Sequence, residues 1–437
     1  MTVELAVNEL LSDPLWNDIR ASVFVTTYFA EPRVGHNVWC CMSNGVHNRS
    51  KTVHDNAIET ASICRSDPRT KVSPTFKSIE ISVLAPRDLW IKSANIVREE
   101  GYTIYIQSGN KSAFYLPSVW QEEEEWMAYD LIKSLKHKAR ITSFNYDIYK
   151  VPTILINEHG FEYKEWLVKE MGKIILDKVV KFYKPFIDTN GQLPYIIDTR
   201  GEIKYENGDM IRIFYNLADY NRLAGTRLGR KYLGGNNKYS LHEWVALASL
   251  VNSLNSPSLK QIKDKILSYN KHGIFSSDKS FANPQAMLAV ADEIDEQSAK
   301  NFVKQSKNWN VDSFGANWIS QALCALFNRF GWEEIIDILI DKYLPILKNI
   351  DHSSVTQIAC SYHGILIMEK TLMGHSNIRK GVFPLIDHLD LEQYIVDHYY
   401  MQRELENGPF PYYIEQHWYR TDVTFHVTDV IELILNI

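Results

Sequence analysis

Hydrophobic and polar residues follow two different periods in the two parts of this chain. Up to about residue 157, short stretches alternate apolar and polar positions, which is the period of a strand with one buried face. The clearest such stretch holds Ile79, Ile81 and Val83, separated by polar residues. Beyond residue 162 the apolar residues recur at helical spacing almost without interruption. The chain therefore predicts two domains of different fold class.

The first part predicts an α+β domain over residues 1–157, because helices alternate with strands that are mostly linked as hairpins. The predicted strands cover residues 21–27, 38–43, 79–84, 102–107, 112–115 and 149–156, and the predicted helices cover 2–12, 53–64 and 122–140. Pro152 falls inside the last strand. Since proline has no N–H to donate, it indicates an edge strand or a bulge.

The second part predicts an all-α domain over residues 163–437. The predicted helices cover 162–185, 209–225, 239–254, 257–271, 283–294, 296–307, 313–330, 332–347, 353–373, 389–405 and 420–436. Some are apolar on nearly all sides, such as 313–330, and others are amphipathic, such as 332–347. A helix that is apolar all round belongs to an inner layer and an amphipathic one to an outer layer. About six inner helices alternating with six outer ones predict an (α/α) six-hairpin toroid, with a helical-repeat solenoid as the alternative.

Composition and charge narrow the class of protein. The chain has 437 residues, 45% of them hydrophobic and 23% charged, with a net charge of −6. This balance is typical of a globular protein and gives no basic surface for nucleic acid. No stretch approaches the roughly 18 apolar residues of a membrane span, and the first residues do not resemble a secretory signal. Five cysteines favour a reducing compartment, so we expect a cytoplasmic protein.

Several dispersed motifs carry a family resemblance in the first part. They are Val23-Phe24-Val25-Thr26, Ser66-Asp67-Pro68-Arg69, Ile81-Ser82-Val83-Leu84 with Pro86, the hairpin after Gly101, Leu116-Pro117 with Val119, and Trp126 ahead of Leu131 and Leu135. In this order they resemble the AMMECR-type domain, over about a third of the chain. The resemblance implies association with MEMO-type and radical SAM proteins, and gives no defined reaction.

The most typical AMMECR run, Leu-Arg-Gly-Cys-Ile-Gly, is replaced here by Val-Trp-Cys-Cys-Met-Ser at residues 38–43, where only Cys41 keeps its identity. Cys41 is the candidate nucleophile of this domain, with His36, His47 or His54 as its base. The alternative is a buried cysteine that packs as a small hydrophobe. Arg69 is a candidate ligand contact, unless its Asp-Pro-Arg turn only ends a helix.

The second part resembles, in architecture, the six-hairpin glycosidase-like superfamily. In such a toroid the starts of the inner helices surround one mouth of a central cavity. The predicted catalytic residues there are Asp209, Asp422 and His426, and the predicted substrate-binding residues are Tyr195, Arg212, His242, Glu243, Trp318, Tyr412, Trp418 and Arg420. Such acids, imidazoles and aromatic rings suit a sugar-like or peptide-like substrate. Asp209 and Asp422 can instead cap their helices.

Metal binding is a further alternative. Cys360 and His363 lie at i and i+3 on one predicted helix, and Cys324 is a third possible ligand. Zinc-dependent toroids such as lanthionine cyclases resemble this arrangement, but their characteristic surroundings are absent here. From the sequence we therefore assign no metal site and no cofactor, and we expect His398 to lie on the solvated surface. Three functions stay open: a biosynthetic tailoring enzyme, a non-catalytic interaction protein, and a zinc-dependent peptide cyclase or transferase.

Overall fold

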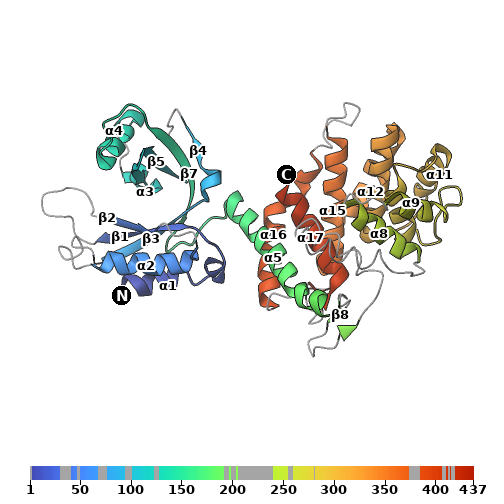
Figure 1. The fold of residues 1–437 in the computed structure, drawn as a ribbon, viewed down its shortest axis with the longest axis horizontal. Helices are drawn as coiled ribbons and strands as arrows, with labels where there is room; N and C mark the ends of the chain where they lie inside the picture. Colours follow the sequence, from blue (N-terminus) through green and yellow to red (C-terminus); the bar gives the residue numbers. More distant parts are fainter. Residues whose placement is uncertain are drawn as a thin grey trace. The chain divides into compact units, whose positions relative to one another are not determined.

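The computed structural model describes residues 2–29, 41–46, 50–66, 76–93, 101–122, 127–190, 196–197, 203–204, 240–253, 259–279, 281–373, 384–405, 410–411, 414 and 419–437. The chain divides into two compact units, residues 1–170 and 171–437 (Figure 1). We call them the sheet unit and the helical unit. The boundary falls inside helix α5 (Glu165–Asn190), and the domain division at residues 157–163 stays a prediction.

The sheet unit is built on an antiparallel sheet. Its strands are β1 (Ser22–Phe29), β2 (Cys41–Val46), β3 (Phe76–Leu84), β4 (Ile91–Lys92), β5 (Tyr102–Ser108), β6 (Lys111–Tyr115) and β7 (Asp147–Ile156). They pair in the order β2-β1-β3-β7-β5-β6, and β4 also pairs with β7. The mixture of helices and an antiparallel sheet agrees with the α+β pattern of the sequence.

Short helices accompany this sheet. They are α1 (Val3–Leu10), η1 (Pro14–Asn17), α2 (Val53–Ser66), η3 (Arg87–Leu89), α3 (Pro117–Glu122) and α4 (Ala128–Ala139). Among them, α1, α2, α3 and α4 contact its strands. Helix α2 packs on β1 and β2, and the side chains of Val25 and Ile81 are fully buried. A buried amide fixes α2 to the sheet, because Asn56 Nδ2 donates to the carbonyl oxygen of Ala21 at 2.8 Å. Helix α4 packs on β5 and β6 around Leu131 and Leu135.

Of the two alternatives for the Pro152 strand, the edge position is wrong, because β7 pairs with β3 on one side and with β5 on the other, and the bulge stays a prediction. The Ala85 N–H donates to the Pro152 carbonyl at 2.9 Å. Pro152 has no N–H with which to return that bond to Ala85. The Ala85 carbonyl instead accepts from Trp90 Nε1 at 2.9 Å. A neighbouring indole thus makes proline tolerable in an interior strand.

Strand β2 continues further than the sequence predicts. It runs to Val46, whereas the predicted strand stops at Ser43. Gly45 pairs with Phe24 of β1, and a Cβ atom at Gly45 would lie 2.5 Å from the Phe24 ring. Because glycine leaves that space to the ring, Asn44-Gly45 continues the strand here instead of forming a turn.

The helical unit consists mainly of helices at the predicted places. After α5 they are α8 (Leu241–Ser253), α9 (Leu259–Leu267), α10 (Ala282–Val290), α11 (Glu296–Ser306), α12 (Ser313–Phe330), α13 (Glu333–Ile338), η4 (Leu339–Tyr343), α14 (Leu344–Lys348), α15 (Val355–Leu372), η5 (Leu385–His388), α16 (Leu391–Glu404) and α17 (Thr421–Leu435). The predicted helix 209–225 lies outside the described residues. No described helix combines the length and the apolar character needed to cross a membrane.

Two layers are distinguishable among these helices. Helix α8 packs on α10, α10 on α12, α12 on α15, and α15 on α17, so every second long helix contacts the next in an inner row (Figure 1). Helix α12 is buried along almost its whole length, as predicted for an inner helix. The segment from α13 to α14 buries one face only. Closure of the row into a toroid stays a prediction.

The predicted helix 332–347 contains a wider π-helical turn, η4, between α13 and α14. Pro345 follows immediately, in the first turn of α14. Proline cannot donate a backbone hydrogen bond, and its ring crowds the carbonyl one turn earlier. A local widening of the helix ahead of Pro345 relieves both effects.

Candidate functional site at the starts of the inner helices

Aromatic and imidazole rings gather where four inner helices begin. His242 is in the first turn of α8, Phe281 directly precedes α10, Phe314 and Trp318 are in the first turns of α12, and His426 is in the second turn of α17. The ring centroids are 5.0 Å apart for His242–Phe281, 5.5 Å for Phe281–Phe314, 5.6 Å for Phe314–His426 and 5.7 Å for Trp318–His426. We call these five residues the aromatic wall.

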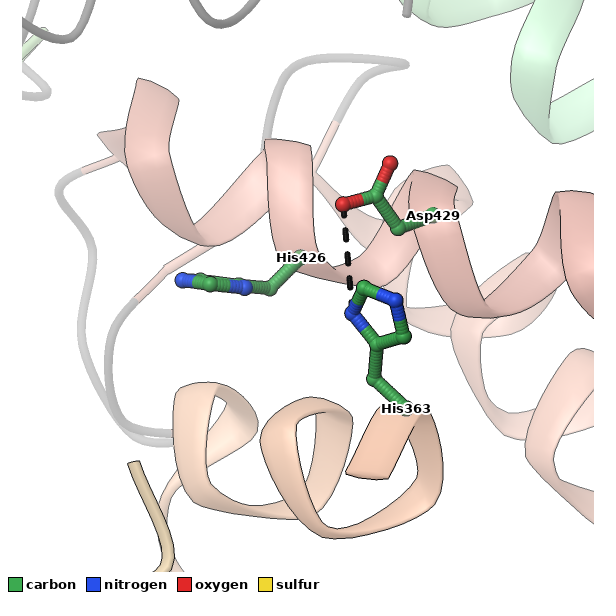
Figure 2. A group of neighbouring side chains, drawn as sticks. All are labelled: His363, His426 and Asp429. Atoms are coloured by element: carbon green, nitrogen blue, oxygen red, sulfur yellow. Dashed lines mark ion pairs between the residues drawn. The ribbon is translucent and has the colours of Figure 1, made fainter. Parts of the chain in front are cut away.

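An acid and a further imidazole lie beside the wall. His363 Nδ1 of α15 is 3.9 Å from Asp429 Oδ2 of α17, and the two side chains are 9% and 11% exposed. His426 precedes Asp429 by three residues, so both lie on one face of α17. Figure 2 shows His363 extending from its helix towards the Asp429 carboxylate, with His426 next to them. One ligand atom from each of the three residues lies within 4.8 Å of the others.

Helix caps and one glycine position this cluster. Asp312 Oδ1 accepts from the Gly315 N–H at 2.9 Å at the start of α12, and Ser354 Oγ accepts from the Gln357 N–H at 3.3 Å at the start of α15. A Cβ atom at Gly364 would lie 2.7 Å from a Leu347 methyl carbon and 3.4 Å from the Asn317 Cα. The glycine therefore leaves room for Leu347 of α14 against α15, next to His363.

Polar atoms are buried along the same two helices. Asn317 Oδ1 accepts from Gln321 Nε2 at 3.0 Å. Asn317 Nδ2, Ser320 Oγ and Ser361 Oγ are buried without a hydrogen-bond partner among the described residues. Such groups are costly to leave unsatisfied, and buried water or a polar ligand usually satisfies them. The inner row thus has a more polar interior than packing alone requires.

Glu243, a predicted substrate-binding residue, is engaged in capping its own helix. Its Oε2 accepts from both the backbone N–H and the hydroxyl of Ser240 at 2.7 Å, and the Ser240 hydroxyl accepts in turn from the Glu243 N–H at 3.3 Å. This is a capping box. A substrate has to compete with these bonds for the carboxylate.

The remaining predicted residues are described only in part or not at all. Cys41 begins β2 opposite Tyr28, and Arg420 and Asp422 lie in β10 (Tyr419–Arg420) and the first turn of α17, with only their backbones described. Arg69, Tyr195, Asp209, Arg212, Tyr412 and Trp418 lie outside the described residues. Strand β8 (Ile196–Ile197) pairs with β10 and with β9 (Ile203–Lys204). The chain segments after Tyr195 and after Trp418 therefore run side by side.

The cysteines of the helical unit are buried in its core. Burial raises the pKa of the Cys324 thiol to about 12, and a hydrogen bond with Thr371 offsets only part of that effect. A thiol with this pKa stays protonated at neutral pH and is a poor nucleophile. Cys360 is fully buried on α15. His363 of the same helix extends to Asp429 on α17, an acid that the Cys360–His363 spacing did not point to.

The solvated position predicted for His398 of α16 is wrong, because its side chain is buried. His398 Nδ1 is 2.7 Å from the Tyr394 carbonyl oxygen, and its ring stacks on the Tyr394 ring at 4.1 Å. Burial lowers the pKa of His398 to about 4, although that hydrogen bond and the charge of Asp397 act in the opposite direction. His398 is therefore a neutral core residue.

Sequence reasoning missed Asp429, Phe281 and Phe314. Asp429 is three residues after His426, the spacing that places two side chains on one helix face, so it could have been found from that rule. Phe281 and Phe314 lie beside predicted helix starts, but aromatic residues there are as typical of packing as of a site.

Comparison with known proteins gives weak likenesses only. No protein-family model matches the chain, and no curated protein is detectably similar to it. An uncharacterized protein from Pyrococcus horikoshii superimposes with a TM-score of 0.29 and 17% identity, over 37% of this chain and 92% of that one. The GH76A α-1,6-mannanase from a Salegentibacter species gives a TM-score of 0.41 and 9% identity, over 61% of this chain and 98% of its own. An inactive variant of that mannanase, in complex with α-1,6-mannotriose, gives 0.40 and 10% over the same shares.

These scores carry no argument about function. The AMMECR-type and toroid resemblances therefore stay predictions.

Proposed function

We propose that the helical unit is a tailoring or modification enzyme. It binds a sugar-like or peptide-like small molecule against the aromatic wall and acts on it through the neighbouring histidines and Asp429. The observation that supports this is the juxtaposition itself, in which two buried histidines and one carboxylate from α15 and α17 stand next to rings from α8, α10 and α12. Aromatic rings supply stacking surface, and the imidazole–carboxylate pair supplies proton transfer near neutral pH.

A low-dielectric setting makes this cluster effective. The His426 side chain is 2% exposed, and Trp318 and Phe314 pack around it. Charge–dipole interactions with a bound molecule are stronger where water is excluded. Asp422 lies four residues before His426 in α17 and stays a predicted second acid, as a glycosidase mechanism requires two carboxylates.

The second candidate function is a non-catalytic interaction protein. In that case the sheet unit serves as a second site or partner platform, and a MEMO-type or radical SAM protein is the expected partner by family resemblance. The difference between the two functions is measurable, because a pure binding protein holds a small molecule or a partner and leaves it chemically unchanged.

A ligand panel tests the proposal on the full chain. The panel comprises aryl glycosides, manno- and gluco-oligosaccharides, and short peptides, with binding followed by saturation-transfer NMR and turnover by mass spectrometry. We expect at least one class to bind, and His426→Ala to weaken binding by about 100-fold or to abolish turnover while circular dichroism shows that the protein stays folded. His352→Ala is the matched control, since His352 is exposed in the same unit. No binding by any class, or unchanged binding by a folded His426→Ala protein, contradicts the proposal.

A further inference from the structure

The three residues His363, His426 and Asp429 have a geometry that the enzymatic proposal alone does not require. Two neighbouring inner helices supply them, His363 from α15 and the other two from adjacent turns of α17 (Figure 2). Proton transfer needs only one acid–base pair. A third donor group within 4.8 Å of that pair suggests a different task for the set.

We propose that His363, His426 and Asp429 bind a divalent first-row transition metal ion of the zinc class. Their donor atoms lie within 4.8 Å of one another. An ion at the centre of such a triangle is at most about 2.8 Å from each donor, against bond lengths of roughly 2.0–2.2 Å to imidazole nitrogen and carboxylate oxygen. Coordination therefore requires the three side chains to rotate towards one point, which shortens these distances to bonding range.

The donor types select the kind of ion. Two imidazoles with one carboxylate suit zinc and its first-row neighbours, and three protein ligands leave a coordination position open. Magnesium and calcium require six or more oxygen ligands and fit this set poorly. The carboxylate also offsets part of the ion's charge in a site where little water reaches the ligands, since His363 and Asp429 are about nine-tenths buried.

This inference rests on the proposed function and deepens it. His426 belongs both to the triad and to the aromatic wall, so the open coordination position lies close to where a substrate would stack. A metal ion there polarises a substrate oxygen or activates a bound water. The ligand set differs from the one considered from the sequence, since neither Cys360 nor Cys324 belongs to it.

The test measures metal binding without reference to activity. Tag-free full-length protein is stripped with a chelator and titrated with Zn²⁺ by calorimetry, and metal content is measured by mass spectrometry after dialysis. We expect one Zn²⁺ per chain. His363→Gln, His426→Gln and Asp429→Asn each remove a direct ligand, so each should weaken binding by about 100-fold or more. The metal-free variants should keep the wild-type circular dichroism, which shows that they remain folded.

Two controls keep this result specific. His352→Gln removes an exposed histidine and Cys360→Ala removes the buried thiol on α15, and both should leave the Zn²⁺ affinity within about twofold. Substitution with Co²⁺ should give ligand-field bands without a thiolate charge-transfer band.

The metal site is overturned if the protein does not bind Zn²⁺ stoichiometrically. It is also overturned if Cys360→Ala weakens Zn²⁺ binding and Asp429→Asn does not. If the ligand panel still binds in that case, the proposed function stands without the metal. If Zn²⁺ binds but no ligand of the panel does, the metal site stands and the proposed function fails.

Discussion

Among the described residues of the helical unit, buried histidines lie in two places, which differ in whether a carboxylate faces the ring. His398 of α16 is enclosed by Tyr394 and Phe410, with a backbone carbonyl as the hydrogen-bond partner of its Nδ1. His363 of α15 is buried to a similar degree, but its Nδ1 faces the Asp429 carboxylate. An imidazole held among aromatic rings loses its charge, whereas an imidazole beside a buried acid has a partner for a proton or an ion.

The difference shows how to separate core histidines from functional ones. Burial alone is a feature of packing, because a neutral imidazole with one satisfied nitrogen behaves as a polar aromatic ring. A carboxylate in the same interior is costly to bury unless it is paired, and Asp429 faces an imidazole, whereas the buried Glu369 accepts from the Leu385 N–H at 2.7 Å. The proposed function therefore centres on Asp429 and its neighbours, and we regard His398 as structural.

The largest expected effect is a loss of folding stability at acid pH that is caused by His398. Its pKa is lowered from 6.5 to about 4 in the folded protein, so the unfolded chain takes up this proton first as the pH falls. The stability that the neutral ring contributes is complete above pH 6.5 and is lost progressively as the pH falls through 4, by about 3 kcal/mol in total. Urea unfolding followed by circular dichroism measures it.

His398→Leu is the matched variant for this titration. It removes the titrating group, so the loss of unfolding free energy between pH 8 and pH 4 should be smaller than in wild type by roughly 3 kcal/mol. Equal losses in the two proteins would mean that His398 titrates at its ordinary pKa and is not a neutral core residue.

The next effect tests whether the Asp429 pair is kept for stability. Asp429→Leu leaves the buried His363 imidazole without this carboxylate and should lower the free energy of unfolding by about 2 kcal/mol. Adding His363→Leu replaces the pair by apolar side chains and should recover that loss or exceed it by about 1 kcal/mol. Chemical denaturation of both proteins measures this. A double variant less stable than the single one would assign the pair a structural role.

The smallest effect contrasts Asp429 with a carboxylate that caps a helix. Asp312 Oδ1 accepts from the Gly315 N–H at the start of α12. Asp312→Ala should cost about 1 kcal/mol of stability, as is usual for a lost cap, and should leave ligand and metal binding unchanged. Thermal melting and calorimetry measure the two quantities, and a loss of binding in this variant would extend the site to the start of α12.

Helix placement could be predicted well from this sequence because the signal is local. The apolar period and the caps define α12 and α15 almost to the residue, and an all-round apolar pattern correctly indicated that α12 is an inner helix. The structure departs from the predicted elements where a single side chain changes the local hydrogen bonding. Pro345 accompanies the π-helical turn, and the Trp90 indole completes the hydrogen bonding around Pro152.

The candidate site could be predicted only in part. His242, Trp318 and His426 were expected together because all three lie near inner-helix starts, and the structure brings them into one wall. Asp429 lies about one turn after His426 in α17, and the helix that supplies its partner His363 is identified only by packing. His398 was misplaced for the same reason, since a histidine next to Asp397 looks solvated until tertiary contacts with Tyr394 and Phe410 bury it.

The most direct test of the central claim measures how substitution of a histidine in each environment changes the affinity for one ligand. The best ligand of the sugar and peptide panel is titrated calorimetrically into wild type, His426→Ala and His398→Leu at pH 7.5, where His398 is neutral. We predict that His426→Ala weakens binding by about 100-fold, or 2.7 kcal/mol, and that His398→Leu stays within about twofold of wild type. Equal affinities for wild type and a folded His426→Ala protein would contradict the account.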